Sequence, residues 1–375
     1  MTERAVLAVA GRPIGFPVVG NRVPRPRELL AGSMSIADMD RISLGNEEFE
    51  GRNNAYVLAD DDADALALVD TGLATDPVRR DLRDGLAERG YDIADVDDIV
   101  LTHFHADHAG LAGEIQAESD ATVYVHEADA PLVAQQPAAT AAVEDRRRSR
   151  LEEWGVPEDA RAELLAFLEA AEVEGRPVDP TPIADGDVLT VGGRTLETIH
   201  TPGHAAGLCC FELDGGGEAF VGDAVLPVYT PNVGGADVRV DRPLEKYTAA
   251  VTRLADRDYE RVWPGHRDSI SEPTARALAI LEHHRERTET VLEFLSANGP
   301  ADAWTVSAHL FGDLEGIHIV HGPGEAFAHL DHLRHEGYLA CENGDYRLRD
   351  GTIDLEDVVP SVRRHRGGSG GSGGR

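Results

Sequence analysis

The sequence predicts a layered α/β protein, and three observations support this prediction. Short apolar runs typical of buried strands alternate with stretches of helical period, as in the order strand, helix, strand between residues 98 and 125. The 375 residues are enough for a large core and for more than one domain. No apolar stretch approaches the roughly 18 to 20 residues that a membrane-spanning helix needs. We therefore expect a protein that does not enter a membrane.

The first part of the chain reads as a hairpin followed by alternating helices and strands. Two β-prone runs flank an acidic turn, and a helix with leucines at helical spacing ends at Gly90. A short strand with the sequence DIVLT, a second helix and another strand follow. The strands are expected at residues 55–58, 65–69, 98–102 and 121–125, and the helices at 77–89 and about 107–118.

Residues 128–179 interrupt this alternation. They are rich in Ala, Glu and Arg, carry apolar residues at helical spacing around Leu164 and Leu168, and show no strand pattern. We interpret this stretch as an inserted helical cap. After it the alternation resumes, with strands expected at residues 188–191, 195–199, 207–213, 219–221 and 261–263 and helices at 244–257 and from Pro273 onward.

A second domain is predicted to follow Gly299, where the long helix from Pro273 stops. Two helices and then a hairpin around Asn343-Gly344 indicate a small winged-helix-like domain. Its helices are expected at residues 305–311 and 324–336 and its strands within 338–348. The two domains are accordingly placed at residues 1–298 and 299–362, before a Gly- and Ser-rich tail at 363–375 that we expect to be disordered.

Acidic residues dominate the charge of the chain. The 68 Asp and Glu residues oppose 35 Lys and Arg, which gives a formal net charge of −33, and Lys246 is the only lysine. This composition indicates a halophilic protein, because at molar salt the Debye length falls to about 3 Å and a dense surface charge is tolerated. The net charge therefore says little about partners. The N-terminal residues lack the pattern of a signal peptide, so we expect a cytoplasmic location.

One short stretch concentrates side chains that bind metal ions. The sequence THFHADHAG, residues 102–110, contains His103, His105, Asp107 and His108 directly after a strand. At strand spacing the two histidines His103 and His105 point to the same side, while the next two donors open the following helix. Uncharged imidazoles and a carboxylate, with no Lys or Arg among them, suit a borderline divalent metal ion.

Three later fragments supply further donors. His204 in Thr-Pro-Gly-His, Asp223 in Gly-Asp-Ala and His266 in Pro-Gly-His each lie where a strand gives way to a loop. All fragments together offer five histidines and two aspartates. A catalytic zinc ion takes three protein ligands plus a water molecule, so seven donors fit two metal ions that share a bridging carboxylate.

The order of these motifs resembles the metallo-β-lactamase-fold hydrolase superfamily. The match covers about residues 53–267 and consists of HxHxDH, TPGH, GDA and PGH, preceded by Asp70 in Val-Asp-Thr-Gly. The resemblance implies a four-layer αββα sandwich with the metal ions at one edge of the two sheets. It also implies a role for each residue: His103, His105 and His204 in a first metal site, Asp107, His108 and His266 in a second, Asp223 as the bridge between them, and Asp70 in support behind the ligands.

Two divalent ions, expected to be zinc with iron or manganese as alternatives, predict a hydrolase. Close cations lower the pKa of a bound water, so that a metal-bound hydroxide attacks and no side chain has to be the nucleophile. Asp107 could orient this hydroxide while Asp223 bridges the ions, and we expect both to be catalytic. His105 stands where relatives with a redox di-iron centre carry Glu, which favours hydrolysis over electron transfer.

The sequence leaves several classes of substrate open. Glyoxalase-II-like relatives favour a small thioester, ester or lactone, with the cap forming the acyl pocket. The C-terminal module resembles a branch of the superfamily that includes an endoribonuclease acting on single-stranded RNA. However, acidic residues outnumber arginines in this module, which disfavours binding to the phosphates of RNA. A regulatory protein that binds nucleic acid or a partner, and a single-iron sulfur dioxygenase, are further alternatives. The module could also pack against a second subunit in a homodimer.

Overall fold

The computed structural model describes residues 39–45, 51–59, 65–170, 175–349 and 358–359. All of these residues belong to one unit that begins at Met39. The tail at 363–375, for which we predict disorder, lies outside the described residues. Within the described ranges, no helix is both long and apolar enough to span a membrane.

Six strands form the first sheet, in the spatial order β1-β2-β3-β4-β5-β6. β1, β2 and β3 are antiparallel neighbours, whereas β3 to β6 run parallel to one another. Parallel strands are usually covered on both faces, and β3, Leu-Ala-Leu-Val, is accordingly apolar and buried throughout. The strands are β1 Arg41–Leu44, β2 Asn53–Ala59, β3 Leu66–Val69, β4 Asp98–Val100, β5 Thr122–His126 and β6 Pro180–Ile183.

Five strands form the second sheet, in the order β11-β10-β9-β8-β7. Neighbouring strands of this sheet are antiparallel except for β10 and β11, which are parallel. The register of that parallel pair shifts between Phe220 and Gly222, and such a bulge redirects the side chain that follows, here Asp223. The strands are β7 Val188–Val191, β8 Arg194–His200, β9 Cys209–Leu213, β10 Glu218–Gly222 and β11 Arg261–Pro264.

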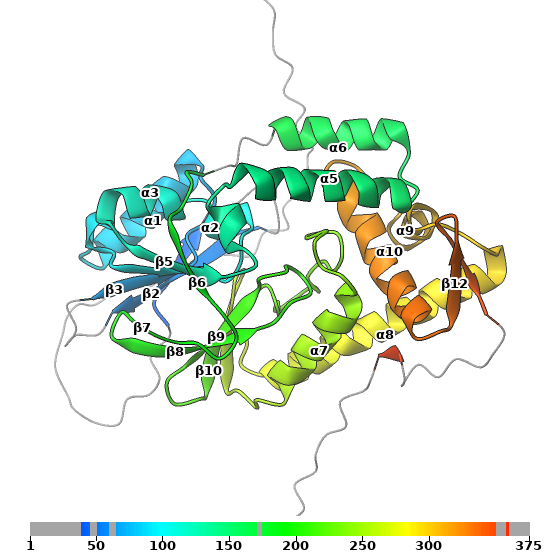
Figure 1. The fold of residues 1–375 in the computed structure, drawn as a ribbon. Helices are drawn as coiled ribbons and strands as arrows, with labels where there is room; N and C mark the ends of the chain where they lie inside the picture. The colour runs from blue at the N-terminus through cyan, green and yellow to red at the C-terminus, as the bar shows by residue number, and fades with distance from the viewer. Residues whose placement is uncertain (1–38, 46–50, 60–64, 171–174, 350–357, 360–375) are drawn as a thin grey trace, which may run out of the picture. The chain divides into compact units, whose positions relative to one another are not determined.

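Helices cover the outer faces of both sheets, and two further helices, α5 and α6, run side by side next to them (Figure 1). A short 3-10 helix spans Ile93–Asp95. The α-helices are α1 Asp76–Glu88, α2 Ala106–Ala109, α3 Ala112–Ser119, α4 Ala130–Val133, α5 Pro137–Glu153, α6 Glu158–Ala170, α7 Pro243–Ala255, α8 Pro273–Asn298, α9 Ala303–Phe311 and α10 His318–His335.

Three apolar clusters follow this arrangement. One lies between the sheets and joins Val100 of the first to Phe220 of the second. Another joins Leu82 of α1 and Ile115 of α3 to the first sheet, and a third joins Ile280 of α8 and residues of α7 to the second sheet. Both sheets are therefore buried on two faces, and their polar residues collect where the strands end.

The C-terminal elements share a fourth cluster with α5, α6 and α8. The hairpin strands β12 Leu339–Glu342 and β13 Asp345–Leu348 follow α9 and α10 in the order expected from the sequence. Trp154 and Leu164, from the stretch interpreted as a cap, are buried in one cluster with Leu295 of α8 and Leu330 of α10. The residues on the two sides of Gly299 thus contribute to a common core.

Most predicted helices and strands are confirmed within a few residues, and the differences have local causes. The sequence analysis missed β1 and β6, which are the two edge strands of the first sheet. β6 contains Pro180 and Pro182, which an edge strand tolerates but which mask its pattern. The helix expected at 107–118 is divided into α2 and α3 around Gly110, and α10 begins before Pro323 instead of after it.

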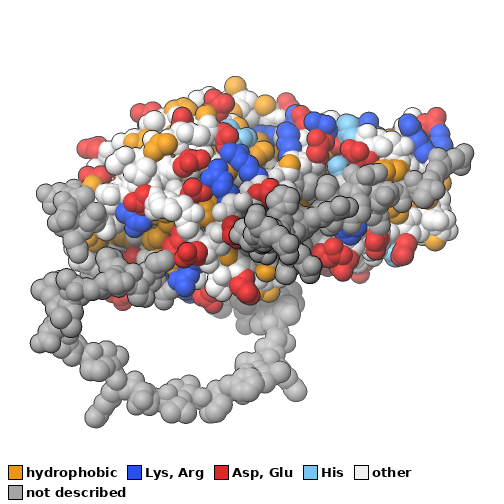
Figure 2. Space-filling view, turned by 90° about the horizontal axis from the view of Figure 1, so that it is seen from below, with side chains coloured by type: hydrophobic (Ala, Val, Ile, Leu, Met, Phe, Trp, Pro, Cys, Tyr) orange, Lys and Arg blue, Asp and Glu red, His pale blue; other side chains and the backbone are white. Residues whose placement is uncertain are grey.

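Charged residues of both signs are interspersed on the surface. Figure 2 shows Asp and Glu side chains spread over the visible face with Arg side chains between them. Many of these arginines form ion pairs, such as Arg83 with Glu118 and Arg253 with Asp185. Such exposed pairs contribute only about 0–1 kcal/mol each.

A buried histidine on β5 should make the fold sensitive to mild acid. The ring of His126 stacks on that of His200 at 3.9 Å, and burial, with the charge of His200, lowers the pKa of His126 to about 4. An unfolded histidine titrates near 6.5, so between pH 6.5 and 4 the unfolded chain binds a proton that the folded chain does not. We expect the free energy of unfolding to fall as the pH falls through this window. Denaturant titrations at several pH values should show a flatter dependence for H126Q; an unchanged slope would contradict this account.

Candidate metal centre

The seven residues singled out in the sequence lie together at one edge of the two sheets. They come from separate segments of the chain: the loop after β4, the short helix α2, the turn after β8, and the ends of β10 and β11. Six of them are buried and the seventh, His105, is partly buried; the buried ones are His103, Asp107, His108, His204, Asp223 and His266.

Three histidines form a first group of donors. His103 Nε2 lies 2.8 Å from His105 Nδ1, and His204 Nε2 lies 3.1 Å from the same Nδ1 atom. The three nitrogen atoms lie within 4.8 Å of one another. Each histidine therefore presents one ring nitrogen to a common point.

Asp107, His108 and His266 form a second group. His108 Nε2 lies 3.8 Å from Asp107 Oδ2, and His266 Nε2 lies 3.5 Å from the same oxygen atom. Asp107 and His108 come from α2, whereas His266 follows β11. Both groups therefore combine donors from the two sheets.

Asp223 lies between the two groups. Its Oδ2 atom is 3.7 Å from His204 Nε2 in the first group and 3.4 Å from His266 Nε2 in the second, and its Oδ1 atom is 3.6 Å from His108 Nε2. One carboxylate thus faces donors of both groups, as expected for the residue predicted to be the bridge.

Hydrogen bonds on the far side of four histidine rings assign the tautomer of each. The Nδ1–H of His108 donates to Asp70 Oδ2 at 2.8 Å, and that of His103 donates to Thr102 Oγ1 at 3.0 Å. The Nδ1–H of His204 and the Nε2–H of His105 donate to backbone carbonyl oxygens, at 2.9 and 3.1 Å. In the neutral form of each ring, the nitrogen that faces the centre is then an unprotonated acceptor.

This arrangement fits cations and is unfavourable without them. With these tautomers, lone pairs on His103 Nε2 and His105 Nδ1 face each other at 2.8 Å, and the buried atoms His108 Nε2, His266 Nε2 and Asp223 Oδ1 have no hydrogen-bond partner within the described part of the chain. Buried acceptors without donors cost free energy, and lone pairs pointed at one another repel. Divalent cations satisfy all of these atoms at once.

The pKa values show that the carboxylates of this cluster favour positive charge beside them. Burial, reinforced by the charges of His108 and His105, lowers the pKa of His103 well below its ordinary value. Burial would lower the pKa of His108 and His266 as well, but the neighbouring carboxylates, Asp223 above all, raise both above the ordinary value. Burial alone would raise the pKa of Asp223, but His266 and His108 hold it well below its usual range. Because metal ions bind the neutral imidazole, a cation at this centre would displace the protons of His108 and His266 and take the place of their positive charge.

Comparison with known proteins decides the family. A model described as the metallo-beta-lactamase superfamily matches residues 49–266. The chain belongs to this superfamily. It is 31% identical over 281 residues to the probable metallo-hydrolase YqjP of Bacillus subtilis, a match that covers 73% of this chain and 86% of that protein.

A solved structure and a relative with a shorter match extend the comparison. The crystal structure of a metallo-beta-lactamase family protein from Thermus thermophilus superimposes with a TM-score of 0.71 at 32% identity, covering 82% of this chain and 98% of that one. The thioesterase pkgB of Emericella nidulans is 35% identical over 111 residues, which are 29% of this chain and 30% of that protein. The chain is accordingly a metallo-hydrolase of the metallo-beta-lactamase superfamily.

Asp70 supports this metallo-hydrolase centre from behind. Its Oδ2 atom accepts hydrogen bonds from His108 Nδ1 and Thr102 Oγ1, both at 2.8 Å, and its Oδ1 atom accepts from the Thr102 backbone N–H. Because Thr102 Oγ1 also accepts a hydrogen bond from His103 Nδ1, Asp70 is linked to one histidine of each group. Asp70 adopts a left-handed backbone conformation, with φ of 59°, which Asp tolerates better than most residues.

The glycine of Pro-Gly-His is required by close packing. A Cβ atom at Gly265 would lie 2.5 Å from Asp223 Oδ1 and 2.5 Å from His108 Cε1. Any side chain there would displace two donors of the centre. The motif glycine is therefore explained by the approach of the backbone to the cluster, in addition to turn geometry.

A fourth group of donors lies on α8 and α10. His284 Nδ1 is 3.4 Å from His329 Nε2 and 3.8 Å from Glu325 Oε1. Arg287, however, donates to the same Glu325 oxygen at 2.7 Å. Since this guanidinium already neutralises the carboxylate, we interpret the group as a buried polar cluster and not as a metal site.

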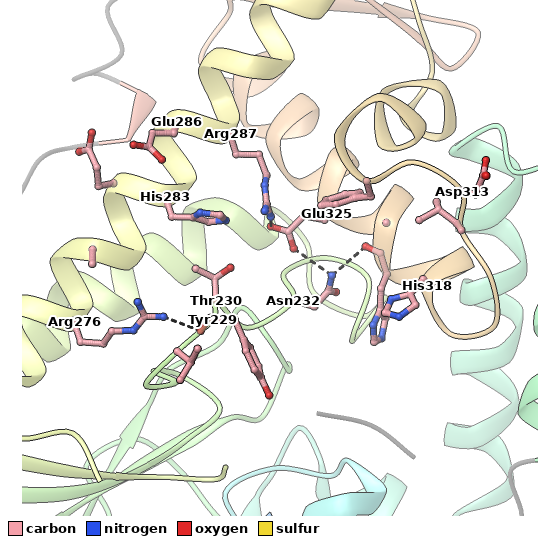
Figure 3. A pocket seen from close by; sticks show the side chains of 17 residues that line it. Tyr229, Thr230, Asn232, Arg276, His283, Glu286, Arg287, Asp313, His318 and Glu325 are labelled. Atoms are coloured by element: carbon pink, nitrogen blue, oxygen red, sulfur yellow. Dashed lines mark hydrogen bonds and ion pairs between the residues drawn. The ribbon is translucent and has the colours of Figure 1, made fainter. Parts of the chain in front are cut away.

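A cavity of about 900 Å³ is lined by residues that include Asn232 but none of the seven donors. It lies between the segment that contains Tyr229 and Asn232, helix α8, and the C-terminal helices, and Figure 3 shows Arg276, Arg287 and Glu325 in its wall. The backbone oxygen of Asn232 is the acceptor for His204, so the cavity and the centre share this residue. None of the described residues that line it come from the predicted cap.

Sequence reasoning missed the groups that orient the histidines. Thr102 is adjacent to the first motif and could have been found, because a hydroxyl before His103 is a common partner for a ligand histidine. The carbonyl oxygens of Asn232 and Ala236 carry no signal in the sequence, since every residue has one. Glu325 and Arg287 lie far along the chain, and their proximity to this segment depends on the packing of α10.

Proposed function

We propose that the seven residues bind two divalent metal ions and that the enzyme hydrolyses a small thioester, ester or lactone. His103, His105 and His204 would hold one ion, Asp107, His108 and His266 the other, and Asp223 would bridge them. The observation that supports this most strongly is the convergence of histidine nitrogens and carboxylate oxygens in adjoining buried groups, where His108 Nε2, His266 Nε2 and Asp223 Oδ1 have no hydrogen-bond partner among the described residues. Zinc is the first expectation, because imidazole and carboxylate ligands suit it, and iron or manganese are alternatives.

Divalent cations held by these residues would supply a bound water of lowered pKa, and so a nucleophile near pH 7. The histidines and Asp223 would fix the positions of both cations. The Asp107 side chain is 11% exposed against 4% for Asp223, so solvent reaches it more readily, which suits it to orient the attacking water. Its Oδ2 atom also accepts a hydrogen bond from Asn53 at 3.1 Å, which restrains the carboxylate.

The choice of a small thioester or ester has two supports. One relative is named a thioesterase. The cavity of about 900 Å³ has the size of a small-molecule site and combines Phe311 and Leu314 with polar groups. Its acids, among them Glu282, Glu286 and Asp313, disfavour a polyphosphate chain such as RNA. Accordingly, we propose this cavity, in place of the predicted cap, as the pocket for the part of the substrate distant from the reacting carbonyl.

The experiment that tests this function compares substrate classes on metal-loaded protein in high salt. One sample receives a panel of acyl thioesters, aryl esters and lactones, and another receives labelled single-stranded RNA. We expect turnover of at least one member of the panel and intact RNA, with activity lost after chelation and restored by added metal. Cleavage of RNA with an inert panel would instead support the endoribonuclease, and oxygen uptake with one iron per chain would support a dioxygenase.

The finer assignments of architecture are proposals of the same kind. We propose that the two sheets and their covering helices form the four-layer αββα sandwich of a glyoxalase-II-like branch, on the support of the three clusters between and outside the sheets. We further propose a cap at 128–179 and a winged-helix-like domain at 299–362. The order of α9, α10, β12 and β13 supports this domain.

A substitution of Asp70 tests whether its hydrogen bonds to His108 and Thr102 strengthen metal binding. We expect D70N, which keeps the size of the side chain and tolerates the left-handed backbone, to weaken metal binding by about 10- to 100-fold, the usual cost of losing such a partner. Competition with a chromophoric chelator measures the affinity. D120N is a matched control, because Asp120 has a similar φ of 60° but is exposed at the end of α3. Equal affinities for D70N and wild type would contradict the assigned role.

A further inference from the structure

The two backbone oxygens that orient His204 and His105 belong to one short loop, residues 232–236. The oxygen of Asn232 accepts from His204 Nδ1 at 2.9 Å, and the oxygen of Ala236 accepts from His105 Nε2 at 3.1 Å. Two of the three ligands in the first group thus depend on the position of this loop. In contrast, Asp70 supports the second group through His108.

The loop is closed on itself by the Asn232 side chain. Asn232 Oδ1 accepts from the backbone N–H of Gly235 at 3.1 Å and from that of Ala236 at 2.8 Å. This bridge fixes the distance between the two orienting carbonyl groups. Any group that holds the Asn232 side chain therefore positions both histidines.

Two groups of α10 hold it: the His321 backbone oxygen accepts from Asn232 Nδ2 at 3.1 Å, and Glu325 Oε2 accepts from the same nitrogen at 3.2 Å (Figure 3). Glu325 Oε2 also accepts from the Val233 backbone N–H at 2.8 Å, and its Oε1 atom accepts from Arg287 at 2.7 Å. The side chain is 3% exposed. A buried carboxylate with three donors fixes its neighbours firmly, because each donor would be left unpaired if it moved away.

The backbones of loop and helix also touch. A Cβ atom at Gly235 would lie 2.5 Å from the Cα atom of His321, and one at Gly324 would lie 2.3 Å from the Cα atom of Gly235. This approach leaves the loop little freedom to move away from α10. The contact and the hydrogen bonds of Glu325 therefore act on the same five residues.

We propose that Glu325 is a positioning residue for the first metal site: through Asn232 and Val233 it sets the loop whose carbonyl oxygens orient His204 and His105. The C-terminal part of the chain would then contribute to the metal centre without supplying a ligand. The inference rests on the proposed binding of two metal ions. It predicts that loss of Glu325 weakens one ion selectively, because no hydrogen bond of Glu325 reaches the partners of His108 or His266.

The test measures metal affinity in two backgrounds that each retain one site. H266A keeps the three histidines of the first group, and H105A keeps Asp107, His108 and His266 of the second. Zinc dissociation constants are measured by chelator competition with and without E325A. We expect E325A to weaken the remaining ion by about 10- to 100-fold in the H266A background and by less than about twofold in the H105A background.

Controls separate positioning from general stability. Glu286 lines the same cavity but makes no described hydrogen bond to the loop, so E286A should leave both affinities unchanged. N232A should reproduce the effect of E325A, and the double variant N232A/E325A should show less than the sum of the two losses, because both act through one loop. If E325A does not fold, E325Q replaces it in the test. This variant keeps the side-chain volume but removes the charge that faces Arg287, and it should weaken the affinity for the same ion by a smaller factor.

Equal losses in both backgrounds, accompanied by a fall in the unfolding midpoint, would overturn the proposal and leave Glu325 a merely structural residue. Unchanged affinity in the H266A background would overturn it as well. Failure of the underlying function would look different, since the parent protein with an intact Glu325 would then not bind two ions.

Discussion

Replacing Asp223 by asparagine should almost abolish hydrolysis while leaving the fold intact. Asp223 is the one residue whose carboxylate oxygens face His204 in the first group and His108 and His266 in the second. An amide has no negative charge and only one acceptor oxygen, so it cannot hold two cations together. Loss of about 4 kcal/mol of transition-state stabilisation, within what a metal ion supplies, corresponds to about a 10³-fold fall in kcat/KM.

Steady-state kinetics on whichever substrate the panel identifies would measure this effect, with thermal unfolding to check the fold. D214N is a suitable control, because Asp214 pairs with Arg194 on the surface and lies in a turn after β9. Activity of D223N within about tenfold of the wild type would contradict the bridging role. It would also favour a centre in which one ion is sufficient.

The largest effect on stability is expected from Arg239. Its guanidinium donates to Asp129 Oδ1 and Asp237 Oδ2, both at 2.6 Å, and both carboxylates are almost fully buried. Burial raises the pKa of Asp129 to about 6 even with Arg239 beside it. R239M keeps an apolar stem of similar length but leaves two buried carboxylates without their cation. Removing one partner of such a pair costs about 3–5 kcal/mol.

Urea denaturation of R239M and wild type at neutral pH measures this difference. R253M provides the comparison, because Arg253 pairs with Asp185 at an exposed position and should contribute less than about 1 kcal/mol. A change below about 1 kcal/mol for R239M would show that the two carboxylates find other partners or protons. R239M should also reduce activity, since Asp129 accepts from the backbone of Phe104, between His103 and His105, and Asp237 accepts from that of Ala206, two residues after His204.

The candidate site could be predicted from the sequence because its donors follow strands. A strand end is short and fixed in direction, so motifs such as His-x-His and Pro-Gly-His place their side chains at one sheet edge whatever the loops do elsewhere. The parallel strands β4 and β5 were predicted from their short β-prone runs of buried Ile and Val residues. The same pattern did not identify β6, where two prolines occur in an edge strand.

The support of the site could not be predicted, for a different reason. Glu325 lies on a helix whose sequence resembles an ordinary amphipathic stretch, and nothing in it indicates contact with residues 232–236. The shared cluster that contains Trp154, Leu295 and Leu330 likewise crosses the boundary expected at Gly299. Apolar periodicity shows that a helix has a buried face but not which other face it meets.

The metal content of the purified protein tests the central claim most directly. After saturation with zinc and dialysis against metal-free buffer of high salt, elemental analysis by mass spectrometry should find two ions per chain. H105A and H266A should each retain one. A single ion per chain in the wild type, or no ion at all, would contradict the account of seven side chains that hold a pair of cations.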